Sequence, residues 1–158
     1  MLAVHHRVRF SIRMARSRCV DGGAVSRSGY SEDCEHVGAR NMWRGAVKRS
    51  IEGRRGQALL VDALAALDDL PEKRLTSGAL SDHEGYCLLG AVGERREIDL
   101  DNIDDHDPYE VARAFNVAPA LAQEIAFVND EGAWRSETPE QRFDRMRHWV
   151  KSLIKVPT

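Results

Sequence analysis

The stretch TPEQRFDRMRHWVKSLI, residues 138–154, carries the strongest amphipathic pattern in the chain. Thr138 and Gln141 have the spacing of a capping box, in which each side chain hydrogen-bonds to the backbone N–H of the other residue. Pro139 suits the first helical position. Apolar residues then recur at intervals of three and four, at Phe143, Met146, Trp149, Val150, Leu153 and Ile154. The pattern predicts a helix with one buried face.

Two further helices are predicted upstream, separated by Arg54-Arg55-Gly56. In the first, Trp43, Val47 and Ile51 lie four residues apart and therefore share one face. The second carries the apolar stripe Leu59, Leu60, Ala63, Leu64 and Leu67. Both segments predict helices that bury one side against the rest of the domain.

The middle of the chain is harder to assign. Residues 71–84 read as a loop, and residues 85–93 contain a short apolar run. Periodicity does not distinguish a strand from a buried helix in so short a run. The glycines and the scarcity of β-branched residues favour a helix there.

Residues 108–130 predict two helices joined by a sharp corner. Asp107 is placed to cap a helix that opens at Pro108, and Asn116 is a plausible left-handed stop. Pro119 then opens the next helix. The small and apolar residues of 111–125 follow the order of a helix-turn-helix.

Together these segments predict an all-α fold, a single compact domain of five to six helices over residues 29–158. Residues 1–28 are expected to form a flexible basic extension, either disordered or non-native. The first 20 residues carry five arginines and no acidic residue. A transit peptide and a basic arm that contacts phosphates are the alternatives for this leader.

The charge of the chain is unevenly distributed. The formal net charge is −2, but residues 1–56 carry 12 basic against 5 acidic residues, a balance of +7, and residues 57–158 carry 11 against 20, a balance of −9. Residues 21–158 alone carry a net charge of −7, because the first 20 residues contribute five arginines. An acidic domain is repelled by phosphate backbones, which disfavours a nucleic-acid partner and favours a protein. No apolar run approaches the ~20 residues that span a bilayer, so no membrane partner is expected.

The three cysteines, Cys19, Cys34 and Cys87, form no disulfide framework and indicate a reducing cytoplasm. Cys34-x-His36 and His83-x3-Cys87 together offer four zinc ligands. Neither pair has the Cys-x2-Cys spacing that marks a zinc site. The sequence therefore predicts no bound metal and no cofactor, with these four residues as weak metal candidates.

Cys87 is also a weak candidate for a catalytic nucleophile, with a histidine as base and Asp130 as the residue that orients it. His83, His106 and His148 are the available bases. Scattered histidines supply such a set in many chains of this size. The alternative is that Cys87 is a small core residue, so we expect a protein without enzymatic activity.

The acidic run at residues 99–107 invites a calcium interpretation, but it lacks the glycine and glutamate of an EF-hand. A solvated loop followed by a helix cap explains it better.

A basic cluster and two tryptophans are the candidate binding residues: Trp43, Arg44, Lys48, Arg49, Arg54, Arg55 and Trp134. Exposed tryptophans are frequent anchors of protein interfaces, and the cluster suits an acidic partner. The simpler alternatives are a solvated helix face that pairs with acidic residues of the same molecule and, for Trp43, burial in the core of the domain.

Several short motifs in the chain resemble a family of small phage and prophage proteins of proteobacteria that has no established activity. The motifs are Gly29-Tyr-Ser-Glu-Asp-Cys34, Trp43-Arg-Gly45, Arg54-Arg-Gly-Gln57, Pro71-Glu-Lys-Arg-Leu75, Cys87-Leu-Leu-Gly-Ala91, Asn129-Asp-Glu-Gly132 and Thr138-Pro-Glu-Gln-Arg142. The resemblance extends from Gly29 to Ile154. It implies an origin in a mobile element and action in a bacterial cytoplasm, and it carries over no catalytic residue.

These features favour an accessory protein that acts without catalysis by binding another protein, such as a component of the host or of its defence. One alternative is a nucleic-acid-binding regulator that uses the corner at 111–125 or the basic cluster. The other is a thiol-dependent enzyme at Cys87.

Overall fold

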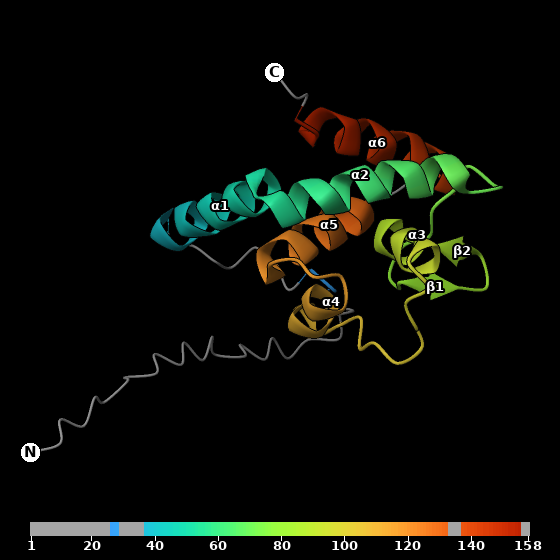
Figure 1. The fold of residues 1–158 in the computed structure, drawn as a ribbon, viewed down its shortest axis with the longest axis horizontal. Helices are drawn as coiled ribbons and strands as arrows, with labels where there is room; N and C mark the ends of the chain where they lie inside the picture. Colours follow the sequence, from blue (N-terminus) through green and yellow to red (C-terminus); the bar gives the residue numbers. More distant parts are fainter. Residues whose placement is uncertain (1–25, 29–36, 133–136, 156–158) are drawn as a thin grey trace, which may run out of the picture.

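The computed structural model describes residues 26–28, 37–132 and 137–155. Within them the chain forms six helices and one short hairpin (Figure 1). In chain order they are α1 (Val37–Glu52), α2 (Arg54–Asp69), β1 (Ser81–Asp82), β2 (Gly85–Tyr86), α3 (Leu88–Arg95), α4 (Pro108–Ala114), α5 (Pro119–Glu131) and α6 (Pro139–Leu153). The predicted all-α fold is confirmed.

Helices α2 and α5 form the centre of the domain. The predicted stripe on α2 is buried except at Leu64, which is partly buried, and Leu60 and Leu67 are completely inaccessible. Helix α2 packs against α1, α3 and α6. Helix α5 contacts α1, α3, α4 and α6 (Figure 1). Leu121 and Ile125 of α5 join the same core. Burial of one apolar stripe per helix is the main stabilising term of this fold.

The junction of α1 and α2 differs from the sequence prediction. Arg54-Arg55-Gly56, expected to separate the helices, forms the first turn of α2, and Gly53 alone interrupts the helical path. Gly53 has extended backbone angles, φ −71° and ψ 154°. Gly56 is needed inside the helix because a Cβ there would lie 1.9 Å from the carbonyl oxygen of Ser50. The glycine therefore permits close packing of the two helices.

Residues 71–93 contain both a strand and a helix. Ser81 pairs with Tyr86 and Asp82 with Gly85, so the predicted loop at 71–84 includes β1 of a small antiparallel hairpin. Helix α3 follows after one residue and confirms the helix that the composition of this stretch favoured. Gly90 lies where α3 crosses the hairpin, and a Cβ there would be 1.8 Å from the carbonyl oxygen of Leu80.

The predicted corner between α4 and α5 is present. The Asp107 carboxylate accepts hydrogen bonds from the backbone of Tyr109 and Glu110 at the start of α4, which explains part of the acidic run as a helix cap. Asn116 has the left-handed φ of 56°. The backbone N–H of Val117 donates to the carbonyl of Ala112 and completes the turn.

Helix α6 begins with the predicted capping box of Thr138 and Gln141. Its Arg145 donates two hydrogen bonds to Glu137, at 2.6 and 2.9 Å, and also reaches the carbonyl oxygens of Val128 and Asn129 near the end of α5. The hydrogen bond from Arg145 lowers the pKa of Glu137 against the opposing effect of burial, and the charge of Arg142 adds to the lowering. Arg145, in the middle of α6, thus links the end of α5 to Glu137, just before α6 begins.

We expect Gly90→Ala to destabilise the domain by about 1–3 kcal/mol, because the clash with the Leu80 carbonyl outweighs the better helix propensity of alanine. Urea denaturation measures the change. Gly45→Ala in α1 is the matched control, since its new methyl group would meet only the end of the Arg49 side chain, at 3.2 Å. The control should be neutral or stabilise by up to about 1 kcal/mol. Equal effects at the two positions would contradict the close crossing of α3 and the hairpin.

We expect Glu137→Gln to lower the free energy of unfolding at pH 7 by about 1–3 kcal/mol, the usual contribution of a hydrogen-bonded charge pair. Since folding lowers the pKa of Glu137 below its ordinary 4.5, the stabilisation is complete above about pH 4.5. It is lost as the pH falls through the lower pKa of the folded state. The difference in the free energy of unfolding between the wild type and the variant should therefore disappear at acidic pH. Glu72→Gln, at an exposed carboxylate, should leave stability unchanged at both pH values.

Candidate functional site

A groove of about 340 Å³ lies between α1, α5 and the end of α6. It is lined by Trp43, Arg44, Val47, Lys48, Ile51, Glu52, Glu124, Ser152, Leu153 and Lys155. Three of the residues that the sequence analysis selected for binding, Trp43, Arg44 and Lys48, therefore share one concave surface. Arg44 and Lys48 lie four residues apart and share one side of α1, and Trp43 precedes Arg44 directly.

The groove combines an apolar floor with a mainly basic rim. Val47 is buried, and Trp43 is half-buried, so part of its ring remains accessible. Arg44, Lys48 and Lys155 are exposed at the rim. Two carboxylates, from Glu52 and Glu124, also belong to the lining. The rim keeps an excess of one positive charge over these two acids.

Gln57 holds the end of α6 against α1 and so builds one wall of the groove. Its amide nitrogen donates to the carbonyl oxygens of Ile51, at 2.8 Å, and Leu153, at 3.0 Å. Its amide oxygen accepts from the backbone N–H of Lys155 at 2.8 Å. Nothing in the sequence near Gln57, the last residue of the motif that begins at Arg54, indicates this role.

The basic cluster is divided between two places. Arg54 and Arg55 are exposed in the first turn of α2 and do not line the groove. Arg55 instead reaches the corner between α4 and α5, where it donates to the Asn116 side chain at 3.3 Å. Trp134 lies outside the described residues. The candidate binding surface is therefore centred on α1.

The geometry argues against a DNA-reading role for the α4–α5 corner. In a helix-turn-helix the second helix must be accessible to enter the major groove. Here every residue of 119–130 is buried or half-buried, because α5 packs against four other helices. The corner is a packing element of the domain.

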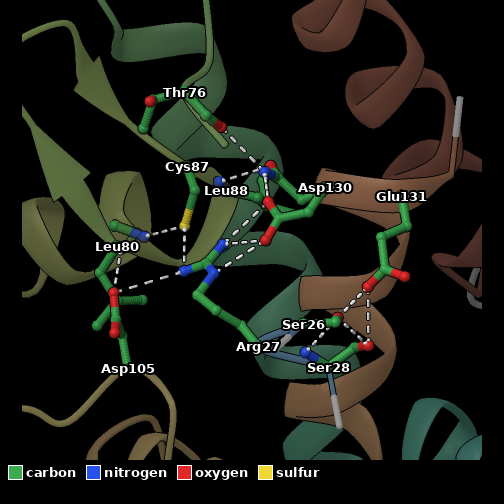
Figure 2. Close-up of polar contacts among 12 residues, drawn as sticks. Ser26, Arg27, Ser28, Thr76, Leu80, Cys87, Leu88, Asp105, Asp130 and Glu131 are labelled. Carbon is green, nitrogen blue, oxygen red and sulfur yellow. Dashed lines mark hydrogen bonds and ion pairs between the residues drawn. The ribbon is translucent and has the colours of Figure 1, made fainter. Parts of the chain in front are cut away.

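Cys87 lies at the start of α3 in a buried polar cluster (Figure 2). Its thiol caps the helix by accepting from the backbone N–H of Gly90 at 3.4 Å, and Nη1 of Arg27 approaches it to 4.0 Å. Only 2% of Cys87 is exposed. Burial raises the pKa of the thiol, and the nearby Arg27 and Gly90 offset this only in part. Cys87 is therefore a neutral, buried thiol at neutral pH, which argues against a nucleophile.

Of the catalytic partners considered for Cys87, Asp130 lies near the thiol, but no described histidine bonds to it (Figure 2). Its hydrogen-bond partners among the described residues are Gly90 and Arg27, and no histidine is one of them. His106 contacts Asp105 instead, at 2.7 Å, and His148 is exposed on α6. Asp130 is engaged by Arg27.

The structure assembles no zinc site from its described residues. His83 is exposed in the turn of the hairpin while Cys87 is buried, and Cys34 and His36 lie outside the described residues. The one group of three metal-ligand side chains in the described ranges is Asp104, Asp105 and His106 on the loop before α4. The backbone of Leu80 and His106 already donates to the Asp105 and Asp104 carboxylates.

Arg27 is a residue that the sequence analysis missed. It was assigned to the leader, yet Ser26–Ser28 contacts the domain, and only 6% of Arg27 is exposed. Its guanidinium forms two hydrogen bonds with the Asp130 carboxylate, at 2.9 and 3.0 Å (Figure 2). Residues 1–25 of the leader lie outside the described residues. The surrounding small and polar residues, 21–31, gave no local signal of this contact.

No protein-family model matches this chain, and neither a curated protein nor a solved structure is similar to it. None of the described helices is long and apolar enough to cross a membrane.

We expect Cys87 in the native protein to react with iodoacetamide at least about 100-fold more slowly than in the unfolded chain. That ratio corresponds to an opening free energy of about 3 kcal/mol, within the range of buried elements. The rate should be followed by mass spectrometry of the peptide that contains Cys87, since the chain has two other cysteines. A native rate equal to that of the unfolded chain would restore the thiol-dependent enzyme as a candidate.

Proposed function

We propose that this protein acts by binding another protein, through the groove between α1, α5 and the end of α6. The observation that carries the proposal is the half-buried ring of Trp43 beside exposed Arg44 and Lys48 in one concave surface. Protein interfaces concentrate their binding energy in aromatic and arginine residues at the centre of such surfaces. A role in binding also agrees with the inaccessible thiol of Cys87.

The chemistry of the groove favours an acidic, amphipathic segment of the partner. Apolar side chains of that segment would pack on Val47 and Ile51, and its carboxylates would face Arg44 and Lys48. A volume of about 340 Å³ is at the small end of ligand pockets and suits a few side chains of a peptide. An amphipathic helix that places one apolar face in a groove is a common form of such recognition.

Electrostatics supports a protein over a nucleic acid as the partner. Residues 21–158 carry a net charge of about −7, so a polyanion such as DNA is repelled by most of the surface. A short acidic segment needs only the local basic rim. The resemblance to phage and prophage proteins supports a partner in the bacterial host or its defence, met in the cytoplasm.

The test is crosslinking in a bacterial host from two positions of the chain. A photoreactive amino acid in place of Lys48 should capture one specific protein, and the same residue in place of Arg113 on α4 should not. Arg113 is a suitable control because it is exposed and contributes nothing to the groove.

Charge-reversal variants measure how much the basic rim contributes to the affinity for the captured partner. Lys48→Glu should weaken binding of the captured partner at least about 10-fold, because a charge pair becomes a repulsion, and Arg113→Glu should leave affinity unchanged. Isothermal titration calorimetry with the purified partner measures both. Equal capture at the two positions would overturn the proposal. Capture that disappears on nuclease treatment would instead support the nucleic-acid alternative.

A further inference from the structure

The side chain of Arg27 fills a socket built from three separate parts of the domain. Asp130 comes from the end of α5, Cys87 from the start of α3, and Asp105 from the loop before α4 (Figure 2). Nη1 of Arg27 lies 3.9 Å from the Asp105 carboxylate and 4.0 Å from the Cys87 sulfur. The space left beside the guanidinium is about 10 Å³, room for at most about one water molecule.

The acceptors of the socket are held in place by bonds that do not involve Arg27. The amide nitrogen of Asn129 donates to Oδ1 of Asp130 at 2.8 Å. The backbone N–H of Leu80 donates to Oδ2 of Asp105 at 3.2 Å. The thiol of Cys87 accepts from Gly90. The walls of the socket are therefore organised by the domain itself, as expected of a preformed binding site.

The chemistry of the socket is specific for a guanidinium. The two oxygens of Asp130 accept a parallel pair of hydrogen bonds from Nε and Nη2, a geometry that the planar fork of arginine matches and the single ammonium of lysine does not. The flanking residues add a second contact, since the hydroxyl groups of Ser26 and Ser28 both donate to Glu131, Ser28 at 2.9 Å. Ser26-Arg27-Ser28 thus contacts the domain in the manner of a bound peptide.

We propose that this socket is an arginine-recognition site for peptides with small hydroxyl residues beside the arginine, occupied in cis by Ser26-Arg27-Ser28. The segment is separated from α1 by residues 29–36 in the sequence, and its bonds hold residues 26–28 against the domain. When Arg27 is removed, an arginine peptide supplied in trans takes its place. This inference does not depend on the groove at Trp43, because the two sites share no lining residue.

The test uses Arg27→Ala and the peptide acetyl-Ser-Arg-Ser-amide. We expect the variant to lose about 10 °C in melting temperature, because the Asp130 carboxylate loses its counter-charge. Millimolar peptide should recover part of that loss, and acetyl-Ser-Lys-Ser-amide should recover much less. The wild type, whose socket is filled, should not respond. Arg96→Ala is the matched control: it removes an arginine paired with Asp62 on the surface of α2, and the peptide should not change its stability.

A second measurement keeps the proposal testable if Arg27→Ala does not fold. In the wild-type protein, the Nε–H proton of Arg27 should exchange slowly with solvent in nuclear magnetic resonance spectra, and Asp130→Asn should accelerate that exchange at least 10-fold. Fast exchange in the wild type would overturn the proposal. It would equally be overturned by a folded Arg27→Ala variant that keeps the wild-type melting temperature, or that responds alike to the arginine and lysine peptides.

Discussion

The buried amide of Asn129 is the interaction on which the arrangement of α3, α5 and the loop between α2 and β1 depends. Its oxygen accepts from the backbone N–H of Leu88 at the start of α3, and its nitrogen donates to the carbonyl of Thr76 and to Asp130. With 1% of Asn129 exposed, an apolar replacement would leave an N–H and a carbonyl without partners in the core. The same amide orients Asp130, so the packing of the helices and the socket for Arg27 have a common origin.

Features encoded by a few neighbouring residues were predictable from the sequence. The caps at Asp107 and Thr138 and the left-handed turn at Asn116 each depend on contacts within about four residues. The apolar stripes of α2 and α6 follow from helical periodicity in the same way. The candidate groove was partly predictable for the same reason, since Trp43, Arg44 and Lys48 lie on one helix.

Features that join distant parts of the chain were not predictable. The bonds of Gln57 to Leu153 and of Arg27 to Asp130 span 96 and 103 residues. Gly56 shows the same limit: it looked like a break between helices, but its lack of a Cβ serves the close approach of α1, which is visible only once both helices are placed. Asn129 gave no local sign of its role, because it lies in the last turn of α5, where asparagine commonly ends a helix.

The charged residues of this protein determine where segments bind more than how tightly they bind. Arg27 is neutralised inside the domain by Asp130, so it contributes nothing to an external field, and a buried pair of this kind adds specificity of contact more than net stability. Arg44 and Lys48 remain exposed on a domain that is otherwise acidic. Such a local basic patch attracts an acidic segment, while the acidic remainder of the surface repels it. Because exposed charge pairs contribute little binding energy, the affinity of the groove must come from the ring of Trp43 and the apolar floor beneath it.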